Sequence, residues 1–293
     1  MSNNINWGKI YESTAWGSGV TDNNISWGKS YADLAGGGGF TGLLDTYSGA
    51  AAAYSLRQLS STYSGNAIKV RRASDNAEQD IAFANNELDT ATLETFASGT
   101  DAFVTTWYDQ SGNGYDMAQT SAVEQPKIVS SGSTILENGK PTIYFDGAND
   151  WLLNNDTIST ASNYWVFYAR NLRTGSGDYV FDTQSGRMVF EQTYQTAYFA
   201  EGFKGTAISS GNHLVHLELV SPSSGAVYED GVNTQSGLSY TQTLISSANA
   251  IGGRYFLGNN ADINMQEFII YNTDQSTNRT GIETNINDFY SIY

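Results

Sequence analysis

Short apolar runs separated by turn-forming residues recur from Leu43 onward, and this pattern constrains the fold more than any other feature of the chain. The runs lie at Ala67–Arg71, Ala102–Tyr108, Thr142–Phe145, Tyr164–Ala169, Leu214–Val220, Ala226–Glu229 and Met265–Tyr271. Such short runs, alternating in places between apolar and polar residues, are typical of β-strands. Because aromatic residues make up 13% of the chain, strands are favoured and a sizeable core is available. The sequence predicts an all-β sandwich.

One helix is predicted at the end of the chain, after the strand Phe268–Tyr271. Ser276 can cap this helix, and Ile282, Ile286 and Phe289 fall on one of its faces. We expect the helix to pack on an edge of the sandwich.

The charge and the absence of cysteine exclude several classes of function. The 14 Lys and Arg residues stand against 30 Asp and Glu, a formal net charge of -16 that repels phosphate backbones and anionic lipid. We therefore expect neither nucleic acid nor a membrane as partner. Without cysteine there is no disulfide and no thiolate chemistry. The start of the chain lacks both a basic stretch and an apolar stretch, so we expect no signal peptide and folding in a cytoplasm.

Residues 1–40 form a separate N-terminal arm in this interpretation, followed by a main domain at 41–293. The segment 3–11 returns as 23–31, and both copies carry a Trp-Gly pair. Neither copy is long enough to bury its own rings, so the aromatics need a partner surface. That surface is either the sandwich or another protein of an assembly, and the flexible joint Gly36–Gly39 favours the second. The predicted anchoring residues are Trp7, Tyr11, Trp16, Trp27 and Tyr31.

Three segments of the main domain resemble the catalytic domain of the alpha-L-arabinofuranosidase B family. They are Ala52–Leu59, Val70–Asp75 and Tyr108–Gly114. The resemblance implies a concanavalin A-like (LamG-type) jelly-roll β-sandwich. The third segment is also similar to many concanavalin-like modules of bacterial and viral surface proteins, so it indicates a fold better than a reaction.

The residues that carry catalysis in this family are replaced here. Hydrolysis of a glycoside by the usual route needs two carboxyl groups across the scissile bond. Where the family places its nucleophilic Glu this chain has Val189, and the nearest carboxylate is Glu191, about 6 to 7 Å further along a strand and on the same face. Where the family places its acid, after Gly252–Gly253, this chain has Arg254, which cannot donate a proton near neutral pH. Tyr179–Val180 stands in place of two adjacent family cysteines. These departures predict a non-catalytic relative.

A calcium loop and a structural turn are both compatible with the segment that begins at Asp109. Asp109, Ser111 and Asn113 place oxygens at alternate positions, with Gly114 sixth, as in the first half of a calcium loop. Thr120 stands where the loop needs a bidentate Glu. We therefore favour a structural turn and expect no cofactor, with calcium as the alternative.

A sugar-binding face is predicted from aromatic and polar residues of the main domain, because rings stack on sugars while carboxylates and amides hold hydroxyls. The candidates are Tyr179, Asp182, Glu191, Arg254 and Tyr255. An ion pair between Asp182 and Arg254 is the structural alternative, and for Trp151 we expect a core position. His213 and His216 should point to opposite faces of a strand, which excludes a shared metal ion.

Taken together, the arm, the glycine joint and the altered sandwich are similar in organisation to bacteriophage virion proteins. The sequence therefore predicts a capsid decoration, head fibre or tail fibre that is homo-oligomeric, made in a host cytoplasm and located in the virion. Its arm would bind other virion proteins, and its sandwich would face host or environmental glycans. The alternatives are an arabinofuranosidase-like glycoside hydrolase using Glu191 with a displaced acid such as Asp262, and a bacterial carbohydrate-binding module.

Overall fold

The structure is a computed structural model that describes residues 39–159, 163–173, 179–185, 189–192, 195–199, 202–204, 209–220, 224–238, 246–253 and 260–293. The chain divides into two compact units, Met1–Phe40 and Thr41–Tyr293. The anchoring residues Trp7, Tyr11, Trp16, Trp27 and Tyr31 lie outside the described residues. Their role therefore stays a prediction.

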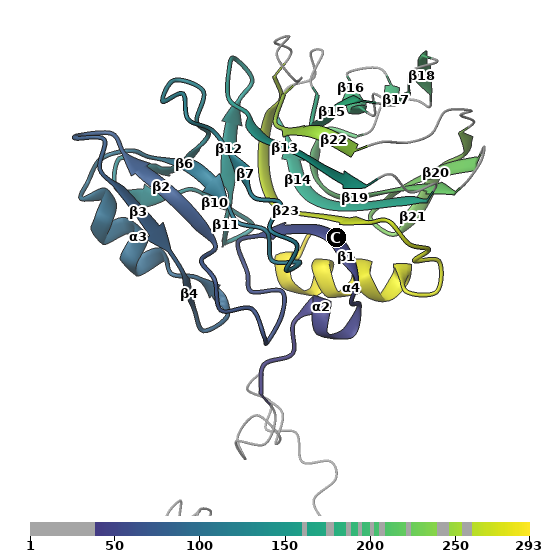
Figure 1. Cartoon of the computed structure of the whole chain (residues 1–293), viewed down its shortest axis with the longest axis horizontal. Helices are drawn as coiled ribbons and strands as arrows, with labels where there is room; N and C mark the ends of the chain where they lie inside the picture. Colours follow the sequence, from purple (N-terminus) through teal and green to yellow (C-terminus); the bar gives the residue numbers. More distant parts are fainter. Residues whose placement is uncertain are drawn as a thin grey trace, which may run out of the picture. The chain divides into compact units, whose positions relative to one another are not determined.

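Antiparallel strands build two layers of the second unit (Figure 1). The first layer contains, in order, β21 (Val232–Leu238), β20 (Ser224–Glu229), β19 (Gly211–Val220), β14 (Tyr164–Leu172) and β23 (Asp262–Tyr271), with β1 (Ala50–Ser55) and β12 (Ile143–Asp146) both on the far edge of β23. The second layer contains β18 (Gly202–Lys204), β17 (Gln195–Phe199), β16 (Val189–Gln192), β15 (Phe181–Ser185), β22 (Ser246–Ile251), β13 (Leu152–Ser159), β7 (Met117–Ala118), β6 (Ala102–Trp107), β2 (Ile68–Arg72) and β3 (Glu78–Ile81).

Shorter elements complete the unit. Strand β8 (Lys127–Ser130) links the layers by pairing with β6 and β12, and it also pairs with β9 (Ser133–Thr134). Two small hairpins are β4 (Phe83–Ala84) with β5 (Glu87–Leu88), and β10 (Leu136–Glu137) with β11 (Lys140–Pro141). The helices are α2 (Leu43–Thr46), α3 (Thr90–Ala97) and α4 (Arg279–Tyr290).

The inner faces of the two layers meet in one apolar core. Tyr168 and Phe268 of the first layer belong to the same cluster as Phe181 and Leu152 of the second. The rings of Phe181 and Phe268 lie 4.9 Å apart. Each large apolar side chain buried in this way contributes roughly 1.5–3 kcal/mol. The predicted all-β sandwich is confirmed, and each predicted apolar run overlaps a strand.

The C-terminal helix forms as predicted, but its start and its position differ from the prediction. It begins after Asn278 rather than Ser276, and Tyr290 instead of Phe289 completes the buried stripe with Ile282 and Ile286. A spacing of four residues keeps these three side chains on one face of the helix. The helix covers the outer face of the first layer instead of an edge, because alternate strand residues such as Phe167 give that face a second apolar surface.

Helix α3 was not predicted from the sequence. Its signal is local: Asp89 accepts a hydrogen bond from the backbone N–H of Thr92 at 3.0 Å, and Ser98 ends the helix in the left-handed conformation with φ of 51°. Such an N-cap is a recognised start signal. Within the described residues, no helix combines the length and apolar character needed to cross a membrane.

Candidate functional site

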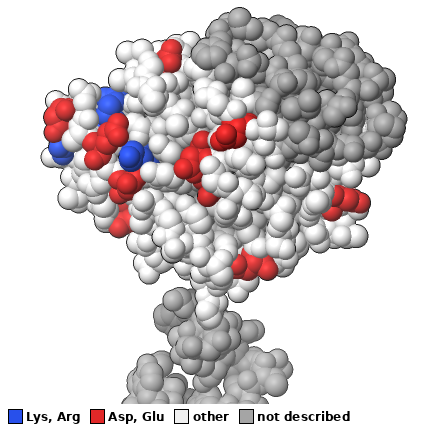
Figure 2. Space-filling model, viewed as in Figure 1, with Lys and Arg blue, Asp and Glu red and all other residues white. Residues whose placement is uncertain are grey.

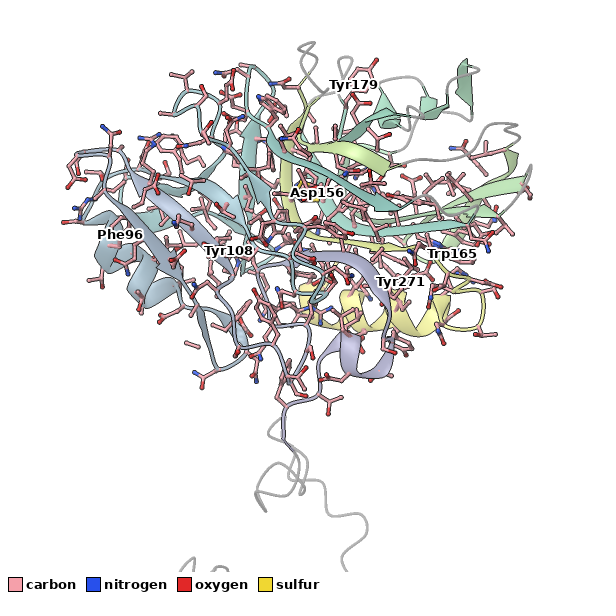
Figure 3. The ribbon with its side chains drawn as sticks, viewed as in Figure 1. Phe96, Tyr108, Asp156, Trp165, Tyr179 and Tyr271 are labelled. Atoms are coloured by element: carbon pink, nitrogen blue, oxygen red, sulfur yellow. The ribbon has the colours of Figure 1, made fainter. Side chains whose placement is uncertain are left out.

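Tyr179 lies just before β15, on the side of the sandwich away from helix α4 (Figure 3), and Asp182 is the second residue of that strand. The backbone of Tyr179 forms an isolated parallel bridge with Asn260. Tyr179 is 5% exposed and Asp182 is 3% exposed. A sugar could therefore stack on the Tyr179 ring only if neighbouring side chains moved. A buried carboxylate such as Asp182 remains compatible with a catalytic role.

Asp182 lies in a ladder of three strands, β15, β16 and β22. Asp182 lies opposite Val189 of β16 on one side and opposite Ala250 of β22 on the other. Glu191 follows Val189 by two residues on β16, and its side chain is outside the described part of the structure. Arg254 and Tyr255 also lie outside the described residues, so the predicted pairing of Asp182 with Arg254 stays a prediction.

The turn Gly252–Gly253 packs too closely against its neighbours to accept side chains. Gly252 has φ of +84°, and a Cβ atom there would lie 2.1 Å from the Phe145 ring. A Cβ atom on Gly253 would lie 2.8 Å from Oδ1 of Asn260 and 3.3 Å from Cβ of Trp151. Only glycine fits such positions without rearrangement. Trp151 is half-buried beside this turn, rather than in the core as expected.

Three carboxylates gather where β12 and β23 meet. Asp146 lies opposite Asp262 in the ladder, and Oδ2 of Asp150 accepts a hydrogen bond from the backbone N–H of Asp146. Burial, followed by the charge of Asp146, raises the pKa of Asp150 to about 7. Asp262, the displaced acid considered above, lies 3.5 Å from Nε of Arg173. Asp150 can therefore hold a proton near neutral pH, and sequence reasoning missed it because burial leaves no local signal.

Acidic groups are spread over the visible surface rather than confined to this end. Figure 2 shows Asp and Glu at several separate places on one face, with Lys and Arg gathered toward one side. This distribution agrees with the net charge of -16.

The loop that begins at Asp109 is built as a hydrogen-bonded turn. Oδ1 of Asp109 accepts from the backbone N–H groups of Ala53 and Ser111, and its Oδ2 accepts from the Ser111 hydroxyl and the backbone N–H of Tyr115. Asn113 donates to the carbonyl of Ala51 at 3.0 Å. Both oxygens of the Asp109 carboxylate, which a calcium ion would need, are thus bonded to the protein's own donors.

Two results are expected of this loop. Adding calcium or a chelator should leave the thermal midpoint of unfolding unchanged, because the Asp109 carboxylate already has donors for both oxygens.

Asp109→Asn should lower the free energy of unfolding by about 1–3 kcal/mol, since an amide N–H₂ would face backbone donors in a buried site. Calorimetry with and without calcium measures both, and a midpoint that rises with calcium would instead indicate an ion site.

The two histidines are held in different surroundings. His213 is half-exposed, with Nδ1 2.7 Å from a carboxylate oxygen of Asp230, whereas His216 is fully buried on the outer face of the first layer. Among the residues that the structure describes, no group of three or more His, Cys, Asp or Glu side chains could hold a metal ion.

Sequence comparison connects the chain to known proteins. The family model "Alpha-L-arabinofuranosidase B, catalytic" matches residues 45–177. A probable alpha-L-arabinofuranosidase B of Aspergillus fumigatus is 39% identical over 85 residues, and one of Aspergillus flavus is 38% identical over 85 residues. Each match covers 27% of this chain and 17% of the fungal protein.

Structural comparison extends the likeness over most of the chain. An arabinofuranosidase complexed with arabinofuranosyl-alpha-1,2-xylobiose has a TM-score of 0.62 at 19% identity, covering 81% of this chain and 62% of that one. A GH54 alpha-L-arabinofuranosidase soaked with a cyclic sulfate inhibitor has a TM-score of 0.62 at 18% identity, covering 83% of this chain and 64% of that one. At this identity the likeness establishes the fold.

These findings overturn the prediction of a non-catalytic bacteriophage virion protein, capsid decoration or fibre, together with its virion localisation. The relatives and neighbours named above are arabinofuranosidases, not virion components. The prediction was wrong because a Trp-Gly repeat and a run of glycines do not identify a binding partner. The described sandwich resembles the catalytic domain of the alpha-L-arabinofuranosidase B family, in sequence over residues 45–177 and in fold over about four fifths of the chain.

Proposed function

We propose that this chain is a glycoside hydrolase that cleaves alpha-L-arabinofuranosidic bonds, with Glu191 and Asp182 as its two carboxyl groups. The family match over residues 45–177 supports the substrate class. The fold likeness to arabinofuranosidases supports the scaffold. Because a scaffold alone does not specify a reaction, the proposal depends on the carboxyl groups.

The observation that carries the proposal is the pairing of β15 with β16. Asp182 lies directly opposite Val189, and positions two apart on a strand share a face of the sheet. The position of Glu191 is therefore diagonal to Asp182, and such diagonal neighbours are about 7–8 Å apart. Ala250, which flanks Asp182 on β22, is small. This spacing suits a pair of carboxyl groups that act on the two sides of one glycosidic bond.

The carboxyl groups would divide the reaction between them. Asp182 donates a proton to the leaving oxygen as the bond to the anomeric carbon breaks. At a carboxyl separation of about 5–5.5 Å, Glu191 attacks that carbon, and water activated by Asp182 then hydrolyses the resulting glycosyl-enzyme. At about 6.5–9.5 Å, Glu191 instead activates the water molecule that attacks the carbon directly. The proposal assigns no chemistry to Val189 or Arg254, because neither side chain can exchange a proton near neutral pH.

The first test is turnover of an aryl glycoside by the whole chain. We expect release of 4-nitrophenol from 4-nitrophenyl alpha-L-arabinofuranoside and no comparable release from the beta-D-xylopyranoside or the alpha-L-arabinopyranoside. NMR of the first sugar formed would report retention or inversion, and hence the carboxyl separation. The proposal fails if no aryl arabinofuranoside is hydrolysed above the buffer rate.

A further inference from the structure

His216 of β19 is buried in an aromatic stack beneath helix α4. Its ring is stacked on Phe167 with centroids 4.2 Å apart, on Tyr228 at 5.1 Å and on Trp165 at 5.2 Å. The residue is fully buried, its Nε2 has no hydrogen-bond partner, and its Nδ1 faces the Glu283 carboxylate. Burial lowers the pKa of His216, against the opposing effect of Glu283. The imidazole is therefore neutral in the folded state near pH 7.

The charged group next to His216 belongs to the first half of α4. Oε1 of Glu283 lies 3.3 Å from Nδ1 of His216, while Oε2 of Glu283 accepts a hydrogen bond from Arg279 at 2.7 Å. The Arg279 guanidinium also lies 4.3 Å from the centre of the Tyr228 ring. Because Arg279 already neutralises Glu283, a proton on His216 would add an uncompensated buried charge.

Other titratable groups around this pair include Glu218, two residues further along β19, and Tyr293 at the last position. Burial raises the pKa of both. The charge of Asp274 acts on Glu218, and the charges of Asp230 and Asp288 act on Tyr293. Because the pKa of Glu218 is raised while α4 lies on the sheet, acid favours this arrangement of the helix. A proton on Glu218 therefore opposes the effect of a proton on His216. Tyr293 is neutral throughout the acid range.

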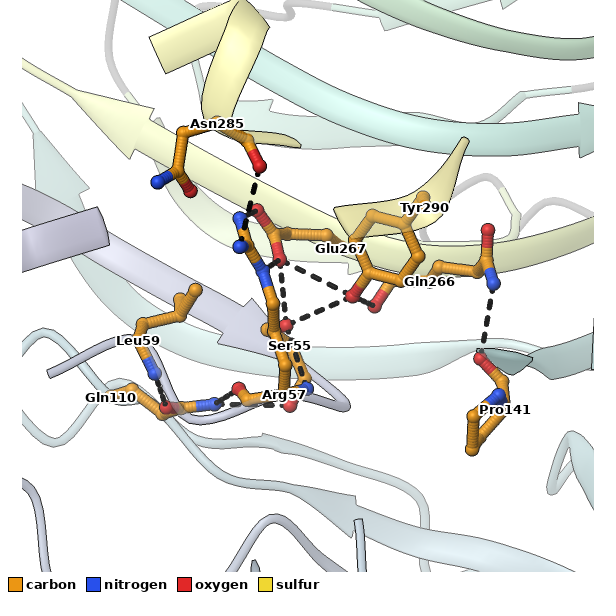
Figure 4. A network of polar contacts seen from close by, with 9 residues as sticks. All are labelled: Ser55, Arg57, Leu59, Gln110, Pro141, Gln266, Glu267, Asn285 and Tyr290. Carbon is orange, nitrogen blue, oxygen red and sulfur yellow. Dashed lines mark hydrogen bonds and ion pairs between the residues drawn. The ribbon is translucent and has the colours of Figure 1, made fainter. Parts of the chain in front are cut away.

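The last turn of α4 is attached by a different set of groups (Figure 4). The hydroxyl of Tyr290 lies 3.2 Å from Oε2 of Glu267 and 3.2 Å from the carbonyl of Gln266. Glu267 forms an ion pair with Arg57, whose Nε lies 2.8 Å from Oε2. Arginine stays charged at any physiological pH, so this end does not depend on a histidine.

We propose that α4 is an acid-sensitive latch, in which protonation of His216 releases the first half of the helix from the sheet while the last turn stays bound. Release exposes His216 to water, where it binds a proton at its ordinary pKa near 6.5. While α4 is packed on the sheet, burial of His216 disfavours that proton. As the pH falls below about 6.5, the opening equilibrium should therefore rise by up to about tenfold per pH unit.

Hydrogen exchange resolved by residue tests the latch in the full chain at pH 7.5 and pH 5.0, with rates corrected for intrinsic exchange. We expect protection of the amides at 283–286 to fall at least about tenfold at pH 5.0. Protection at 287–290 should change much less. Protection that is equal at both pH values would overturn the proposal.

Two substitutions separate His216 from other acid effects. His216→Phe keeps the aromatic stack without a titrating group, and it should abolish the loss of protection at pH 5.0. His213→Gln is the matched control, because it removes the other histidine from the same strand and should leave the loss intact. If His216→Phe does not fold, His216→Gln replaces it. Loss of protection that persists in the folded His216 variant also overturns the latch.

Discussion

Replacing Glu191 with Gln is expected to lower kcat for 4-nitrophenyl alpha-L-arabinofuranoside by about 1,000-fold or more. The amide keeps the size of the side chain but can neither attack the anomeric carbon nor accept a proton from water. Initial rates at saturating substrate measure the change. Glu78→Gln is the matched control, since Glu78 is exposed on β3, and it should keep full activity.

Asp182→Asn distinguishes an acid from a structural carboxylate. If Asp182 protonates the leaving oxygen, its loss should lower kcat by about 100- to 10,000-fold on methyl alpha-L-arabinofuranoside, because methoxide is a poor leaving group without a proton. The cost should be much smaller with 4-nitrophenolate, which leaves readily without a proton. Equal losses on both substrates would point to misfolding or positioning. Asp262→Asn and Asp150→Asn test the other two candidate acids in the same assay.

Breaking the buried pair of Arg57 and Glu267 is expected to cost about 3–5 kcal/mol of unfolding free energy. Nε and Nη2 of Arg57 bind the two oxygens of Glu267 at 2.8 and 3.0 Å, and the Ser55 hydroxyl binds Glu267 at 2.7 Å. Either Arg57→Met or Glu267→Leu leaves the other charge buried without its partner. Denaturant unfolding at pH 7 measures both single variants.

The double variant, Arg57→Met with Glu267→Leu, should be more stable than the sum of the single losses predicts, because no unpaired charge remains. Arg72→Met is the matched control. It removes an arginine from the exposed pair with Asp75, which water screens, and should change stability little. The prediction is contradicted if each single variant loses as little unfolding free energy as the Arg72→Met control. It is also contradicted if the loss in the double variant equals the sum of the two single losses.

The strands could be predicted from the sequence because their signal is local. In β14, for example, apolar Trp165 and Phe167 alternate with Val166 and Tyr168, and both sets are buried. A strand with two buried faces requires something to cover each face. The apolar residues Ile282 and Ile286 of α4, which pack on one of these faces, were also recognisable in the sequence. No local pattern, however, indicates which face of which sheet a helix will occupy.

The candidate site was predicted only in part. Asp182 was named from the sequence only as a member of a sugar-binding face, and Glu191 was considered as a catalytic carboxylate with Asp262 rather than with Asp182. Their relation depends on the register of β15 against β16. The raised pKa of Asp150 had no sequence signal either, because it arises from burial beside Asp146. The predicted virion role rested on the order of segments along the chain, and that order identifies neither a binding site nor a catalytic site.

By itself the sequence determined the class of fold, the places of the main strands and the C-terminal helix, because alternation and helical spacing act between residues that are close in the chain. The tertiary structure alone decided that Glu267 meets Arg57, that His216 lies under Glu283, and that Asp182 has Val189 and Ala250 as neighbours. These contacts form between distant segments when the layers close. Their charges and spacings therefore depend on packing that no local pattern encodes.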